Sequence, residues 1–277
     1  MASYYSGMRD LSGLRAHLAG LGSALLGYSG GVDSALLAVV SREALDRARF
    51  LAVIGRSASY PEAQWRNAVD LAARFDVPLL EVDTAELSDP RYLANPTNRC
   101  FFCKSELWRA LGAVAAERGF GVVLDGTNAD DLSGGEHRPG HGAGMRAGVR
   151  SPLAELGWSK AMVREAARSI GLPTWDAPAS PCLSSRVAYG LAITPERLGQ
   201  VEQGEAFLRS LGFAGDLRVR HLGELARVEV SPAELERARA SWGEIERRLL
   251  DLGFSRAELD PAGYRRGKLL ALAGNDR

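Results

Sequence analysis

The chain has 277 residues, of which 46% are hydrophobic and 25% charged, and its 34 lysines and arginines equal its 34 aspartates and glutamates. These values predict a globular protein of one large or two modest domains that builds its core without disulfides. A formal net charge of zero argues against nucleic acid as a partner. No run of about 18 apolar residues is present to span a membrane, and residues 1–20 lack the apolar core of a signal peptide, so we expect a cytoplasmic protein.

Short apolar runs alternate with helical patterns through the first two thirds of the chain. The expected strands are 24–28, 50–54, 78–82 and 122–124, and the expected helices are 34–44, 61–75, 104–118 and 160–170. Alternating strands and helices predict an α/β domain with a doubly wound parallel sheet. Ligands bind such sheets at the carboxyl ends of the strands, where residues 29–31 and 125–128 lie.

Two segments in this part of the chain show neither a strand pattern nor a helix pattern. Residues 133–148 are rich in glycine, and we expect a mobile loop there that acts as an active-site lid. Residues 173–190 hold three prolines and no periodicity, which is typical of an ordered linker that carries function.

The pattern changes after the linker and predicts a smaller α+β domain. The expected elements are a helix from Pro195 to about Leu211, strands 217–221 and 226–230, helices 232–240 and 243–250, and a strand 255–259. We therefore expect a first domain over 1–178 and a second, for substrate binding and oligomerisation, over 190–277, joined by 179–189.

The segment between the first strand and the first helix has the composition of a phosphate-binding loop. It reads Ser29, Gly30, Gly31, Val32, Asp33, Ser34. Glycines let backbone N–H groups approach phosphate oxygens, and the following helix presents its positive dipole end. Ser29 and Ser34 carry hydroxyl donors, and Asp33 is placed to hold Mg²⁺ or to fix the loop.

No Gly-Lys-Ser/Thr follows these glycines, so the loop is not a Walker A motif. It resembles the PP-loop of the ATP pyrophosphatases, which cleave ATP between the α and β phosphates and adenylate a substrate. The plainer interpretation is a glycine turn that only joins a strand to a helix.

The three cysteines, Cys100, Cys103 and Cys182, are odd in number and follow no secretion signal, which argues against a disulfide framework. Their surroundings resemble the LarE-type pyridinium-3,5-biscarboxylate mononucleotide sulfurtransferases, which help build the nickel-pincer nucleotide of lactate racemase. The resemblance covers nearly the whole chain and rests on residues 29–34, 98–104, 126–132, 138–140, 151–153, 182–186, 218–220 and 226–230. The chain departs from the family around residues 133–147, where a tyrosine and a tighter loop are usual.

The resemblance implies one of two sulfur sources. Family members with a single essential cysteine, at the position of Cys182, give up its own sulfur and keep dehydroalanine. Members with three cysteines are thought to hold a [4Fe–4S] cluster with one open iron that carries an extra sulfide, which assigns Cys100, Cys103 and Cys182 as ligands here. Thiolates suit such clusters. A zinc site, a redox disulfide between Cys100 and Cys103, or inert core cysteines beside a sacrificial Cys182 are the alternatives.

Several polar residues near the expected strand ends are candidates for nucleotide binding. Lys104 and Lys160 are placed to reach the phosphate chain, Ser57 to touch adenosine, and Gly126 to let the backbone approach the nucleotide. Asp130 and Asp131 hold Mg²⁺, position the substrate or cap a helix. The competing interpretations are solvated lysines at helix ends and ordinary turn residues.

Three arginines match the phosphate and carboxylates that the resemblance implies for the substrate. Arg186, Arg218 and Arg220 carry guanidinium forks suited to these anions, and Arg218 and Arg220 share one face of an expected strand. The alternative is a solvated strand face. Four of the tryptophans are expected to pack in the interior and not to stack on a ligand, namely Trp65, Trp108, Trp158 and Trp175.

The combined prediction is an ATP- and Mg²⁺-dependent sulfurtransferase that converts both carboxylates of a pyridinium mononucleotide to thiocarboxylates, with a separate sulfide source and a homo-oligomeric state implied by the family. A tRNA thiolase is the first rival, weakened by the zero net charge. An amidating ligase such as an NAD synthetase would not need three cysteines. A non-enzymatic nucleotide sensor would produce neither AMP nor pyrophosphate.

Overall fold

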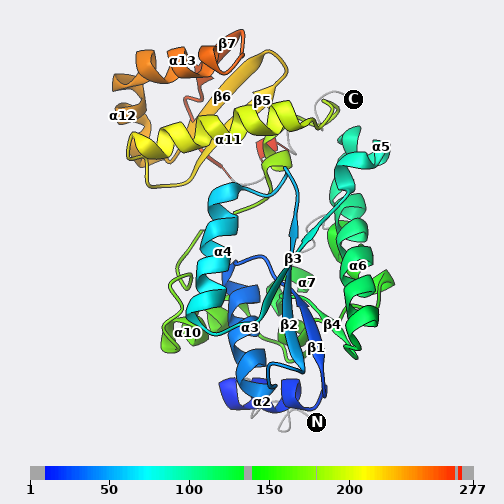
Figure 1. Ribbon diagram of the computed structural model, residues 1–277. Coiled ribbons are helices and arrows are strands. Elements are labelled where there is room, and N and C mark those ends of the chain that lie inside the picture. Colours follow the sequence, from blue (N-terminus) through cyan, green and yellow to red (C-terminus); the bar gives the residue numbers. More distant parts are fainter. Residues whose placement is uncertain (1–9, 134–138, 179, 266–267, 270–277) are drawn as a thin grey trace. The chain divides into compact units, whose positions relative to one another are not determined.

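The computed structural model describes residues 10–133, 139–178, 180–265 and 268–269 (Figure 1). Two compact units make up the chain, and neither is one continuous segment. The first comprises Met1–Ser57, Glu62–Ala85 and Cys100–Ser180, and the second comprises Ala58–Pro61, Glu86–Arg99 and Pro181–Arg277. Within the described residues, no helix is long and apolar enough to cross a membrane.

The first unit is built on a four-stranded parallel sheet. Its strands are β1 (Ala24–Gly27), β2 (Phe50–Arg56), β3 (Leu79–Asp83) and β4 (Val123–Leu124), in the order β3-β2-β1-β4. β1 lies between β2 and β4, and its last residue, Gly27, lies opposite Val53 of β2. Because β2 continues to Arg56, the carboxyl end of β1 lies within the sheet. The predicted doubly wound α/β architecture is confirmed, and β2 continues two residues beyond its expected end.

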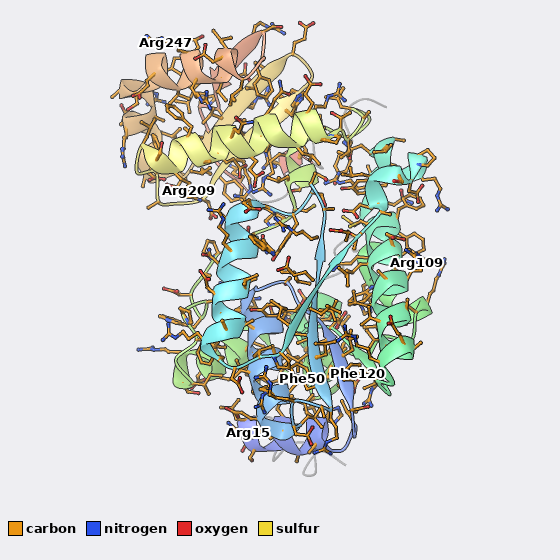
Figure 2. The ribbon with its side chains drawn as sticks, viewed as in Figure 1. Arg15, Phe50, Arg109, Phe120, Arg209 and Arg247 are labelled. Carbon is orange, nitrogen blue, oxygen red and sulfur yellow. The ribbon has the colours of Figure 1, made fainter. Side chains whose placement is uncertain are left out.

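Helices cover both sides of this sheet (Figure 1). The helices of the first unit are α2 (Leu11–Ala19), α3 (Val32–Ala44), α4 (Glu62–Arg74), α7 (Ala129–Ser133), α8 (Pro139–Arg146), α9 (Pro152–Glu155) and α10 (Lys160–Ser169). With them belongs α6 (Arg99–Arg118), which begins at the boundary with the second unit. Figure 2 shows Phe50 inside the unit and Arg109 of α6 pointing away from the sheet.

One face of the sheet packs on α6. Leu25, Leu51 and Val53 form a core cluster with Trp108 and Leu111 of α6. Alternate residues of a strand point to opposite faces, so this cluster uses one face and leaves the other to the remaining helices. Trp108 and Trp158 are buried as expected of packing residues, whereas the prediction is wrong for Trp175, which is exposed.

The prediction of a loop over 133–148 is wrong for residues 139–146, which form α8. The glycines serve close helix packing there: a Cβ on Gly140 would lie 3.0 Å from Cγ of Lys104, and one on Gly144 would lie 3.3 Å from Nε1 of Trp108. Ser133, the first residue of the expected lid, ends α7, and residues 134–138 of the expected lid lie outside the described residues.

The second unit contains a three-stranded sheet. Its strands are β5 (Leu217–Leu222), β6 (Leu225–Val230) and β7 (Arg256–Leu259), with β6 in the middle, antiparallel to β5 and parallel to β7. The helical segments are η1 (Glu86–Ser88), α5 (Pro90–Leu93), η2 (Leu183–Arg186), α11 (Pro195–Ser210), η3 (Pro232–Glu234), α12 (Leu235–Ala240) and α13 (Trp242–Asp251). Thr194 caps α11 by accepting a hydrogen bond from the backbone N–H of Arg197 at 3.2 Å.

The excursion Glu86–Arg99 is tied into the second unit by buried polar contacts. The hydroxyls of Tyr92 and Ser184 lie 2.6 Å apart. The side-chain amide of Asn95 donates to the carbonyl oxygens of Ala188 at 2.8 Å and Leu191 at 3.0 Å. Buried polar groups must find such partners, and these lie about ninety residues further along the chain.

A buried histidine in this unit makes folding depend on pH. His221 is 3% exposed, and its Nε2 lies 3.0 Å from Oε1 of Gln200. Burial, followed by the positive charge of Arg197, lowers the pKa of His221 from 6.5 to about 4. The unfolded chain therefore binds an extra proton between these two values.

We expect the free energy of unfolding to be highest above pH 6.5 and to fall as the pH drops from 6.5 towards 4. The loss through His221 is about 2 kcal/mol after allowance for partial screening. Urea unfolding over this range measures it, and His221→Leu should flatten the slope. An equal slope in both proteins would contradict the assignment to His221.

Candidate active site

The phosphate loop joins β1 to α3 in a conformation that requires its glycines. Gly30 has φ of +67°, which side chains disfavour, and a Cβ there would lie 2.5 Å from Cβ of Ala68 in α4. Inside the loop, Oγ of Ser34 accepts a hydrogen bond from the backbone N–H of Ser29 at 3.2 Å and donates to the carbonyl of Gly31 at 3.1 Å. The loop is thus folded by its own residues.

The start of α3 suits an anion. Gly31 is the N-cap, and among the described residues no side chain caps this end. The first-turn N–H groups of a helix lack partners within the helix, and together with the helix dipole they form a site for phosphate.

The carboxylate of Asp33 is held by two residues distant in sequence. Its Oδ1 accepts a hydrogen bond of 2.9 Å from Nδ2 of Asn128, which follows β4. Its Oδ2 forms an ion pair with Nζ of Lys160, the first residue of α10. The side chains of Asp33 and Lys160 remain 20% and 40% exposed, so this ion pair is accessible to a ligand.

The loop after β4 packs directly on the start of α3. A Cβ added to Gly126 would lie 2.9 Å from the backbone nitrogen of Ser34 and 3.2 Å from the carbonyl carbon of Asp33. Gly126 therefore serves the contact between two loops at the carboxyl edge of the sheet. Ser57 lies at the same edge, one residue after β2 ends at Arg56.

Lys104 and two of the cysteines lie in the first turns of α6. Nζ of Lys104 lies 5.2 Å from the ring centre of Trp108. Cys100 is exposed and Cys103 is partly exposed, and neither forms a disulfide. Their spacing of three residues puts both thiols on one face of the helix.

Cys182 lies in the second unit, directly before η2, and is partly exposed. Its carbonyl oxygen accepts a hydrogen bond of 3.0 Å from Nη1 of Arg186. Among the described residues, no group of three histidines, cysteines or carboxylates is assembled to hold a metal ion.

The three predicted arginines are buried within the second unit, with exposures of 3%, 5% and 6% for Arg186, Arg218 and Arg220, so they do not form a solvated strand face. Arg186 makes a two-pronged ion pair with Glu205 at 2.9 and 3.0 Å. Arg220 pairs with Glu229 at 2.8 Å.

Arg218 packs against an aromatic ring, and its Nη1 donates to the carbonyl of Leu217 at 2.5 Å. Its guanidinium carbon lies 5.0 Å from the ring centre of Tyr264. Burial, followed by the positive charge of Arg186, lowers the pKa of Arg218. A buried cation beside another cation is a favourable place for an anionic ligand.

Comparison with known proteins supplies the remaining evidence. Residues 13–91 match the family model described as NAD synthase. An uncharacterised protein of Synechocystis is 42% identical over 94% of this chain and 96% of its own length. The pyridinium-3,5-bisthiocarboxylic acid mononucleotide synthase of Lactiplantibacillus plantarum is 32% identical over 92% of both chains. An uncharacterised protein of Methanocaldococcus jannaschii is 29% identical over 87% of this chain and 90% of its own length.

The chain belongs to the LarE-type family of ATP-dependent sulfurtransferases. Because the NAD synthase match ends at residue 91, it covers the phosphate loop of this LarE-type enzyme and none of its cysteines. The matched segment therefore contains the phosphate loop and three of the four strands of the sheet, β1, β2 and β3, and it does not extend to the cysteine-bearing segments.

Sequence reasoning missed the residues that hold the predicted ones in the LarE-type site. Asn128 lies in a motif that supports the family resemblance, but it was given no role of its own. Glu205 and Glu229 were not predicted as site residues. The alternation of arginines and glutamate on β5 and β6 was the available signal for Glu229, since the two strands pair along their length.

Proposed function

We propose that this protein converts the carboxylates of a pyridinium-3,5-biscarboxylate mononucleotide to thiocarboxylates, in the synthesis of a nickel-pincer nucleotide. The observation that carries the proposal is the 32% identity, over 92% of both chains, to a synthase named for the bisthiocarboxylic product. The proposed site residues are those of the phosphate loop together with Ser57, Lys104, Gly126 and Lys160 for ATP.

The first step is adenylation. A substrate carboxylate oxygen attacks the α-phosphorus of ATP, the bond to the β-phosphate oxygen breaks, and pyrophosphate leaves. Backbone N–H groups at the start of α3 and the ammonium of Lys160 are suited to the charge on the phosphates. Asp33 is the residue proposed to hold Mg²⁺, since its carboxylate lies in the first turn of α3 beside that ammonium.

The second step transfers sulfur. A sulfur nucleophile attacks the acyl carbon, the bond from that carbon to the phosphate oxygen breaks, and AMP leaves. Three thiols outside disulfides are a donor set that suits iron–sulfur chemistry, so we propose Cys100, Cys103 and Cys182 as ligands of a [4Fe–4S] cluster. Such a cluster would supply a sulfide as the nucleophile, with an external source to replace it.

The partly exposed Cys182, which forms no disulfide, supports a second candidate. Cys182 then acts alone: its thiolate attacks the acyl carbon and displaces AMP, and a base removes its α-proton as the Cβ–S bond breaks. Dehydroalanine remains in the chain and the thiocarboxylate leaves. The enzyme would work once for each sulfur.

The second unit is proposed to bind the mononucleotide. Arg186, Arg218 and Arg220 are its candidates for the phosphate and the carboxylates, since all three are buried guanidinium groups on neighbouring segments of this unit. Arg186 also donates a hydrogen bond to the carbonyl oxygen of Cys182, and we propose that it orients the segment that carries this cysteine. The family resemblance supports a homo-oligomer.

Iron and acid-labile sulfide in anaerobically purified protein test the cluster. We expect about four irons in each chain, with loss in Cys100→Ala, Cys103→Ala and Cys182→Ala alike. Absence of iron from folded wild-type protein, with a mass loss of about 34 Da after reaction, would establish Cys182 as the sulfur donor and overturn the cluster.

A further inference from the structure

Four residues around the phosphate loop form a closed ring of polar contacts. Asn128 donates from Nδ2 to Oδ1 of Asp33 at 2.9 Å, and its Oδ1 accepts from the backbone N–H of Asp130 at 3.0 Å. Oδ2 of Asp130 accepts from the backbone N–H of Lys160 at 2.9 Å, and Nζ of Lys160 returns to Oδ2 of Asp33. Both carboxylate oxygens of Asp33 are thereby assigned to different partners.

This ring connects three elements of the first unit. Asp33 lies on α3, Asn128 directly precedes α7, Asp130 lies on α7, and Lys160 begins α10. Asn128 is 1% exposed, whereas the side chains of Asp33 and Lys160 are 20% and 40% exposed. The buried amide of Asn128 therefore fixes Oδ1 of the Asp33 carboxylate, whereas Oδ2 pairs with the more exposed Lys160.

A second buried asparagine shows what a purely structural amide does in the same chain. Asn95 is fully buried and gives its side-chain N–H groups to backbone carbonyls of a neighbouring segment. Asn128 instead gives its donor to the one carboxylate in the phosphate loop. That difference separates a residue that ties a segment down from one that orients a reactive group.

We infer that Asn128 is a positioning residue for ATP cleavage, which acts by fixing the orientation of the Asp33 carboxylate and of the Lys160 ammonium paired with it. The inference rests on the proposed function only in requiring that the chain cleave ATP. The backbone N–H groups at the start of α3 bind phosphate independently of this amide. Loss of the amide should therefore lower kcat more than it weakens nucleotide binding.

The test is a double-mutant cycle with Asn128→Asp and Asp33→Asn, read as AMP formation with ATP and a pyridinium biscarboxylate mononucleotide. Asn128→Asp has nearly the same shape, lacks the donor and adds a negative charge beside Asp33, and Asn128→Ser removes the amide without that charge. We expect kcat to fall about 10- to 150-fold, the range for loss of one hydrogen bond to a charged group. The affinity for α,β-methylene-ATP should change less than about threefold. The double variant should be no slower than Asp33→Asn alone, because Asn128 acts through Asp33.

Asn95→Asp is the matched control. It removes an equally buried amide donor, so it should lower the melting temperature, and its effect on kcat should be small and independent of Asp33→Asn. If Asn128→Asp does not fold, Asn128→Ser removes the same amide without a new charge.

Unchanged kcat in folded Asn128 variants, additive losses in the cycle, or an affinity loss as large as the loss in kcat would overturn the inference while the proposed function stands. Wild-type protein that forms no AMP with the mononucleotide would overturn the proposed function, and the inference with it.

Discussion

Glu229→Ala is expected to lower the free energy of unfolding by about 3–5 kcal/mol, the usual result of removing one partner of a buried ion pair. Glu229 is 1% exposed and its Oε2 accepts a hydrogen bond of 2.9 Å from Nε of Arg220. Without the carboxylate, Arg220 still donates to the carbonyl of Ser185 at 3.1 Å, but its charge stays in the interior without a counter-charge from Glu229. Urea unfolding near neutral pH measures the loss.

A control at the surface separates burial from charge. Glu236 pairs with Arg239 on α12, and its side chain is 86% exposed, so Glu236→Ala should leave the urea midpoint nearly unchanged. The apolar double variant Arg220→Met/Glu229→Leu should recover much of the stability lost in Glu229→Ala. A loss below about 1 kcal/mol in Glu229→Ala would contradict the burial argument.

Gly126→Ala is expected to reduce kcat/KM for ATP by about 100-fold, the effect of a misplacement approaching 1 Å in a reacting site. The new methyl group would lie 2.9 Å from the backbone nitrogen of Ser34. A helix backbone cannot swing aside as a flexible side chain does, so the loop after β4 and the phosphate loop must separate. AMP formation at limiting ATP measures the result.

Gly112→Ala is the matched control for this substitution. Gly112 lies inside α6, and a Cβ there meets no atom within 4 Å. Alanine in place of a helical glycine should raise stability by about 0.5–1 kcal/mol and leave ATP use unchanged. Equal kcat/KM in Gly126→Ala and wild type would show that the two loops tolerate separation.

The local pattern of the sequence predicted the parallel sheet well. Residues 24–28 and 50–54 are apolar runs of strand length, and β1 and β2 were found there, because a buried parallel strand needs apolar side chains on both faces. The same reasoning failed at α8, where glycine serves close packing against α6 and not a turn. The short helices α5 and α9 have too few residues to show a periodic pattern.

The candidate site was predictable only where its residues are neighbours in sequence. The phosphate loop is continuous, so its motif was readable. Asn128 and Lys160 lie 95 and 127 residues from the aspartate they contact, and nothing in the local sequence links them. Likewise, an arginine on a strand looks the same whether it binds a substrate or a buried glutamate such as Glu229.

The excursion Glu86–Arg99 has a consequence for synthesis on the ribosome. Tyr92 and Asn95 are made early, yet the hydroxyl of Ser184 and the carbonyls near Ala188 that complete their hydrogen bonds are made about ninety residues later. At about 5–20 residues per second, this segment waits several seconds with its polar groups in water. The first unit can begin to fold while the chain grows, but residues 86–99 reach these native contacts only after residues 184–191 have been translated.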